Sequence, residues 1–74
     1  MNEKEKAAFR RNLQKKLDES GLQKGAFAQA LGISGAYLTQ LLSGKRNGDG
    51  IVFDVARKLN IPVCELIGNP CKKE

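Results

Sequence analysis

The sequence predicts an all-α domain, a compact bundle of five short helices. Apolar residues recur at the i, i+3 and i+4 spacing of a helix, and residues that favour turns separate these segments. The 74 residues are enough for one small domain and contain no repeat or interdomain linker. We expect a core over about residues 7–68, with tails at 1–6 and 69–74. The charged residues 1–6 either fray or form the exposed first turn of the first helix, and they are interpreted either as a solvated terminus or as an arm that contacts DNA.

The first helix is expected over about residues 5–19. Phe9, Leu13 and Leu17 follow one another at i, i+4 and i+8, so they form one buried line with the basic residues outside it. Those bases are interpreted either as a solvated face or as occasional contacts to phosphate. After this helix ends, Leu22 is expected to enter the core.

The second helix is expected to begin at residue 23 or 24 and to end before Gly32. Phe27, Ala28 and Leu31 lie on one of its faces, and Gly32 suits the left-handed conformation at a helix C-terminus. Gly25 weakens the start of this helix but lets another backbone come close. One interpretation is that a DNA phosphate approaches Gly25. The other is that Gly25 has no special neighbour and is simply tolerated in the helix.

The third helix is expected over about residues 35–43. Ser34 is the expected N-cap, and Ile33 before it is placed to pack on Leu38. The apolar stripe continues with Leu41 and Leu42. The opposite face carries small and hydrogen-bonding residues and no acid, and two bases follow the helix.

A loop of turn-forming residues, KRNGDG, comes next, with Asp49 as the expected N-cap of a fourth helix over 50–59. A fifth helix follows Pro62, which suits a first helical turn. Ile51 and Phe53 fall off the inward stripe, so they either cover the first helix as partial core or belong to a self-association surface. The inward residues of these two helices are Val52, Val55, Ala56, Leu59, Val63, Leu66 and Ile67.

From about residue 9 to residue 68 the chain resembles the lambda-repressor-like, Cro and repressor type of bacterial and phage DNA-binding domains, the XRE family. Two positions depart from the family pattern: Gln23 replaces the usual Ser or Thr cap, and Gly35 stands where Gln is common. The base code of the family therefore does not carry over. The residues that carry the resemblance are Gly21, Leu22, Ala28, 31–34, Leu38 and 44–46.

The resemblance implies a helix-turn-helix formed by the second and third helices. It implies a sequence-specific DNA-binding transcriptional regulator, a repressor of Cro or phage-repressor type, with the recognition helix, about residues 35–43, in the major groove. It also implies a homodimer, at least on DNA, that binds a near-palindromic double-stranded operator with half-sites roughly 34 Å apart.

Three groups of residues are assigned to this function. Gln40 can offer its amide bidentate to adenine, and Ala36 can contact a thymine methyl group. The expected base contacts are Ser34, Gly35, Ala36, Tyr37 and Gln40. The expected backbone contacts are Gln23, Lys24, Thr39, Lys45, Arg46 and Asn47, which fix register without reading sequence. The expected dimer surface is Ile51, Phe53, Pro62 and Val63.

Composition agrees with a polyanion partner. Thirteen Lys and Arg against eight Asp and Glu give a net charge of +5, which attracts nucleic acid or anionic lipid without identifying either. No apolar run approaches the roughly 18 residues of a spanning helix, and the N-terminus lacks the apolar segment of a signal peptide. We expect a cytoplasmic protein, bacterial or phage-encoded, that joins the nucleoid when it binds DNA and has no membrane partner.

The sequence offers little for catalysis. There is no His, and no nucleophile, base and oxyanion group can be assembled, so we expect no enzyme activity. Cys64 and Cys71 lack companion ligands for zinc and are expected to be reduced thiols. No metal, cofactor or small-molecule ligand is expected.

Two other interpretations stay open. An antitoxin-like or other protein-interaction module could bind its own promoter secondarily, and the sequence does not distinguish a phage switch from a restriction-modification controller. An ordinary αα-hairpin in a helical bundle would explain the apolar residues of the second and third helices equally well. It would leave unexplained the acid-free exposed face of the third helix beside Lys45 and Arg46.

Overall fold

The computed structural model describes residues 1–70, and within that range the chain forms five helices and no strand. The all-helical prediction is therefore confirmed. No helix within this range is long and apolar enough to cross a membrane. The helices are α1 (Glu3–Ser20), α2 (Lys24–Leu31), α3 (Gly35–Ser43), α4 (Val52–Leu59) and α5 (Val63–Leu66).

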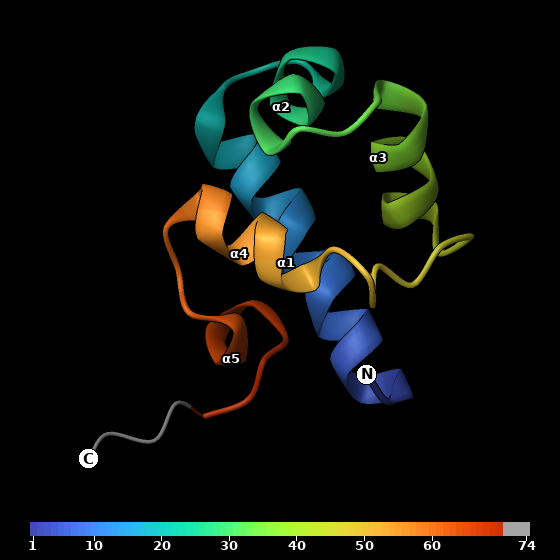
Figure 1. The fold of residues 1–74 in the computed structure, drawn as a ribbon, viewed down its shortest axis with the longest axis vertical. Coiled ribbons are helices and arrows are strands. Elements are labelled where there is room, and N and C mark those ends of the chain that lie inside the picture. Colours follow the sequence, from blue (N-terminus) through green and yellow to red (C-terminus); the bar gives the residue numbers. More distant parts are fainter. Residues whose placement is uncertain (71–74) are drawn as a thin grey trace.

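The long helix α1 is the scaffold of the bundle. It contacts α2, α3 and α5, and α4 contacts α2 and α5 (Figure 1). The helices α2 and α3 lie side by side at one end of the molecule, and α5 lies toward the other end, with the start of α1 (Figure 1). This arrangement leaves one long side of α3 without a helix over it.

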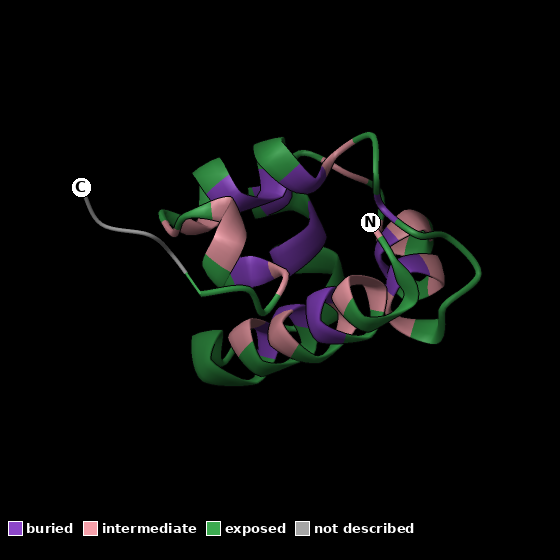
Figure 2. Cartoon of the chain, turned by 90° about the horizontal axis from the view of Figure 1, so that it is seen from below, coloured by how far each residue is buried: buried purple, intermediate pink, exposed green. Residues whose placement is uncertain are grey.

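The predicted apolar lines form the core. Phe9, Leu13 and Leu17 of α1 are buried. The buried residues of α1 and of the other helices lie on the faces of the helices that turn toward the interior (Figure 2). Ile33, Leu42, Leu59, Val63 and Ile67 pack against this core from its edge. The remaining buried apolar residues are Ala8, Phe27, Ala28, Leu31, Leu38, Leu41, Val52, Val55, Ala56 and Leu66.

Helix α1 begins two residues before the predicted start because of a capping box at Asn2. The Asn2 side chain accepts from the Glu5 backbone N–H at 2.8 Å, and the Glu5 carboxylate accepts from the Asn2 backbone N–H at 3.0 Å. Asn69 also donates to that carboxylate, so residue 69 is attached to α1 and not part of a free tail. The Asn2 N–H, followed by the Asn69 amide, holds the pKa of Glu5 below its usual range. Residues 71–74 of the predicted tail lie outside the described part.

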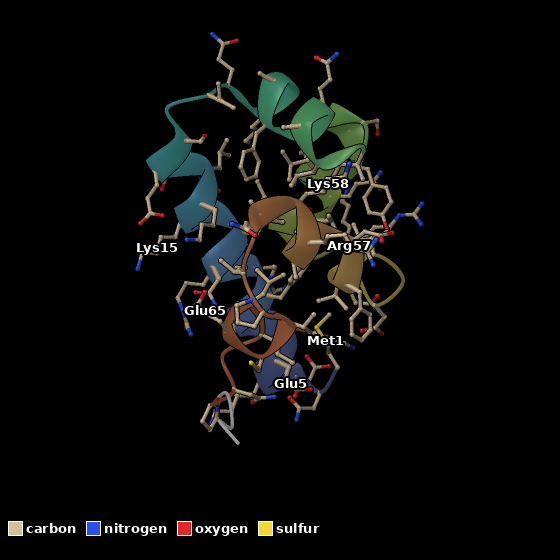
Figure 3. The ribbon with its side chains drawn as sticks, turned by 60° about the vertical axis from the view of Figure 1, so that its left-hand side comes forward. Met1, Glu5, Lys15, Arg57, Lys58 and Glu65 are labelled. Carbon is tan, nitrogen blue, oxygen red and sulfur yellow. The ribbon has the colours of Figure 1, made fainter. Side chains whose placement is uncertain are left out.

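Asp49 does not cap α4 as predicted. The N-cap of that helix is Ile51, which makes no side-chain cap. The Asp49 carboxylate instead accepts from the Met1 α-amino group at 3.1 Å, and Met1 and Glu5 lie together where α1 begins (Figure 3). Sequence patterns predict helix caps from neighbouring residues only. The contact between Asp49 and Met1 spans 48 residues, so such a pattern could not predict it.

Leu22 does not enter the core, contrary to the prediction. Its side chain is 46% exposed in the turn between α1 and α2. The Ser20 hydroxyl accepts from the Leu22 N–H at 3.1 Å and donates to the Leu17 carbonyl at 2.7 Å. This closed turn carries the chain past the core with Leu22 on its outer side.

Candidate nucleic-acid interface

The N-terminal ends of α2 and α3 lie close together, with Gly25 and Gly35 where the two helices meet. A side-chain carbon built at Gly35 would lie 3.9 Å from the Gly25 Cα. This is an ordinary van der Waals distance, and a side-chain carbon at Gly25 itself would meet no atom within 4 Å, so the approach of the two helices does not require glycine at either position. Because the first turns of both helices meet here, their positive dipole ends lie close together.

These two N-termini differ in how they are capped. The Ser34 hydroxyl accepts from the Tyr37 backbone N–H at 3.0 Å, which confirms Ser34 as the N-cap of α3. Gln23 occupies the N-cap position of α2 but makes no side-chain cap. Neither first turn contains an acid, and Lys24 is exposed at the start of α2. The α2 end therefore keeps backbone donors and a positive charge available for an anion.

The outer side of α3 contains the predicted reading residues. Ala36 and Thr39 are exposed, and Tyr37 and Gln40 are half-buried. The Thr39 hydroxyl donates to the Gly35 carbonyl at 3.0 Å, so its proton is used within the helix and its oxygen remains an acceptor. This side of the helix is polar, neutral and free of carboxylates.

Tyr37, Gln40 and Arg46 form one cluster at the C-terminal half of α3. The Arg46 Nε donates to the Gln40 Oε1 at 3.0 Å, and the guanidinium carbon lies 5.5 Å from the centre of the Tyr37 ring. The Arg46 backbone N–H also donates to the Gln40 carbonyl at 3.3 Å. The sequence predicted Gln40 and Arg46 as separate base and phosphate contacts, whereas the structure joins them.

A basic pocket of about 240 Å³ lies next to this cluster. Lys45, Arg46 and Asn47 line one side of it, and α1 supplies the other side. The α1 residues are Glu3, Lys6 and Arg10, of which Lys6 and Glu3 pair at 3.6 Å. Four cations against one carboxylate make this pocket attractive to an anion.

The sequence predicted that Arg10 would be one of the basic residues outside the buried line of the first helix. In the structure Arg10 is half-buried, and its guanidinium lies so close to Gly44 that a side chain at residue 44 would collide with it. The residues are far apart in sequence, so spacing alone could not bring them together. Lys6 and Arg10, at i and i+4, do share a helical face.

The predicted dimer surface separates into two kinds of residue. Ile51 and Val63 pack against the edge of the core. Phe53 is 68% exposed, and Pro62 is exposed at the N-cap of α5. Ile51 therefore belongs to the partial core, one of the two interpretations given for Ile51 and Phe53. Phe53 lies on an open surface, as the other interpretation requires.

The cysteine prediction is wrong for Cys64, which is disulfide-bonded and not a reduced thiol. The pairing replaces the free sulfhydryl that the sequence predicted. Cys71 lies outside the described residues. Within residues 1–70, no group of three or more His, Cys, Asp or Glu is placed to hold a metal ion.

Lys15 and Glu65 lie together on another side of the molecule. Lys15 projects outward from α1 on the side where Glu65 of α5 also lies (Figure 3). None of the three ion pairs found within residues 1–70 involves Lys24, Lys45 or Arg46. The charges of Lys24, Lys45 and Arg46 are therefore not neutralised by a carboxylate of residues 1–70 and can attract an anionic partner.

Comparison with protein-family models, with curated proteins and with solved structures finds no match to this chain.

Proposed function

We propose that the chain is a sequence-specific DNA-binding transcriptional regulator, with α2, the turn 32–34 and α3 as a helix-turn-helix. In this proposal α3 lies in the major groove, which is wide enough for one helix. The simplest mechanism is repression, in which the bound protein blocks RNA polymerase.

One observation carries this proposal: the uncovered side of α3 has no acid and is bordered by cations at both ends. Lys24 and the uncapped N-terminus of α2 lie at one end. Arg10, Lys45 and Arg46 lie at the other. An ordinary αα-hairpin needs buried leucines but does not need this distribution of charge. Duplex DNA does, because a helix that reads bases needs cations at both ends to contact the phosphates.

The contacts divide by what they can recognise. Lys24, Arg10 and Lys45 take phosphates, which fix register. Ala36, Tyr37 and Gln40 face the base edges. Since one α3 reads only a few base pairs, a homodimer on a near-palindromic operator supplies the rest, with half-sites roughly 34 Å apart.

The test is selection of duplex fragments from a random pool by the purified protein, followed by footprinting of the enriched fragment. We expect a near-palindromic site protected over two major grooves. A matched control, Ala36→Glu, places an acid on the exposed side of α3 without touching the core, and it should enrich no site while helicity is retained. Equal recovery of all fragments by the unmodified protein would contradict the proposed function.

Phe53 is expected to contribute to the dimer that binds DNA. Phe53→Asp should weaken operator binding about tenfold or more, because burying a Phe side chain is worth about 1.5–3 kcal/mol. Circular dichroism should change little, since an exposed side chain costs little to replace. The neutral Phe53→Gln is the control for repulsion between the new carboxylate and DNA, and it should weaken binding similarly.

Unchanged operator affinity in both Phe53 variants would remove Phe53 from the dimer surface. It would favour the second candidate function, in which the exposed Phe53 binds a different protein, as in an antitoxin-like module.

A further inference from the structure

The side chain of Arg46 is held in place by α3 from two directions. Its Nε donates to the Gln40 Oε1 at 3.0 Å, and Tyr37 lies under the guanidinium with 5.5 Å between the ring centre and the guanidinium carbon. The backbone of Arg46 is fixed too, because its N–H donates to the Gln40 carbonyl at 3.3 Å. Arg46 therefore belongs to the reading side of α3 although it lies three residues beyond the helix.

This arrangement determines which donors of Arg46 remain. The guanidinium carries one N–H on Nε and four on its two terminal nitrogens. Gln40 takes the Nε hydrogen, and Tyr37 covers one face of the plane. Both partners are neutral, so the charge of Arg46 is undiminished and its terminal nitrogens form a fork of fixed orientation.

The same contact changes what Gln40 can do. Bidentate reading of adenine needs the amide oxygen to accept from adenine N6 and the amide nitrogen to donate to N7. Here the amide oxygen already accepts from Arg46. Gln40 therefore orients Arg46, and a contact to adenine would have to share the same oxygen through its second lone pair.

We propose that Arg46, positioned by Gln40 and Tyr37, reads a guanine through its terminal nitrogens. The inference rests on the proposed function and deepens it by naming the base. A guanidinium fork matches the O6 and N7 acceptors of guanine, the commonest specific contact in the major groove. A phosphate needs only a nearby cation, and Lys45 can supply one, since no ion pair within residues 1–70 involves its side chain. A base needs donors in a fixed direction, which is the reason we give for the two contacts that hold Arg46.

The test measures binding to the selected operator and to duplexes in which each guanine is replaced in turn by 7-deazaguanine, which lacks the N7 acceptor. One guanine per half-site should prove sensitive, with affinity falling about 2- to 10-fold, because the analogue removes one of the two acceptors in a pair worth about 1–3 kcal/mol. Arg46→Ala removes the fork, so this variant should bind the natural and 7-deaza duplexes equally. Lys45→Gln, the matched control at the adjacent cation, should keep the full penalty for the analogue.

The positioning role is tested at Tyr37 and Gln40. Tyr37→Phe keeps the ring and should keep the sensitivity to 7-deazaguanine, whereas Tyr37→Ala and Gln40→Ala should reduce it with helicity unchanged. Two results would overturn the inference: an Arg46→Ala variant that retains the analogue penalty, or one that weakens binding to every sequence alike, as a phosphate contact would. If the unmodified protein discriminates no sequences, the proposed function itself fails and the guanine contact fails with it.

Discussion

Gly48→Ala should lower the free energy of unfolding by about 2–5 kcal/mol. Gly48 has a φ of +76°, where a side chain costs about 1–2 kcal/mol. A Cβ there would lie 2.7 Å from Phe9 Cε2 and 3.3 Å from Leu41 Cδ2. Both neighbours are fully buried and cannot move aside, so overpacking adds about 1–3 kcal/mol. The loop after α3 would then lift from the core, and Lys45 and Arg46 with it.

The matched control is Gly21→Ala. Gly21 has a similar φ of +70°, but nothing lies within 4 Å of the Cβ position. Its substitution should cost only the backbone term of about 1–2 kcal/mol. Urea unfolding followed by circular dichroism compares the two variants, and equal losses would show that Gly48 is not pressed against Phe9.

Leu38→Ala should lower the free energy of unfolding by about 2–5 kcal/mol. Leu38 is 0% exposed and belongs to the core cluster that holds α3 in place. A domain of 74 residues has a total stability of only about 4–11 kcal/mol, so this loss would leave much of the protein unfolded at moderate temperature. Operator binding should fall in parallel, because α3 loses its support.

Leu22→Ala is the control for Leu38, with the same chemical change at a side chain that is 46% exposed. We expect it to shift stability by less than about 1 kcal/mol. Thermal unfolding and operator binding are measured on both variants. Equal destabilisation would contradict the position of Leu22 outside the core.

Local patterns in the sequence were enough to predict the helices and most of their inner faces. Phe9, Leu13 and Leu17 at helical spacing are buried as expected, and Ser34 caps α3. The capping box at Asn2 also had a sequence signal, an Asn followed three residues later by Glu5, which would have given the correct start of α1.

The remaining features depend on contacts between distant segments. In the sequence Asp49 resembles a helix cap, but the structure places the Met1 amino group beside it. Likewise Arg10 resembles a solvated base, but the structure places its guanidinium next to Gly44. The contact between Gln40 and Arg46 requires the chain to reverse after α3, so the two residues looked independent in the sequence. The predicted reading residues stay predictions, but their mutual arrangement came only from the structure.

The central claim is that α3 reads DNA between two phosphate-contacting ends. The most direct measurement is a salt titration of binding to the selected operator and to a scrambled duplex, with the unmodified protein and Lys45→Ala. Lys24, Arg10 and Lys45 in each protomer of a dimer predict a slope of about −5 in log affinity against log salt for the unmodified protein. Lys45→Ala should reduce this slope by about 0.9 per protomer and leave the operator preference unchanged. Binding without salt dependence, or equal affinity for the operator and the scrambled duplex, would contradict the account.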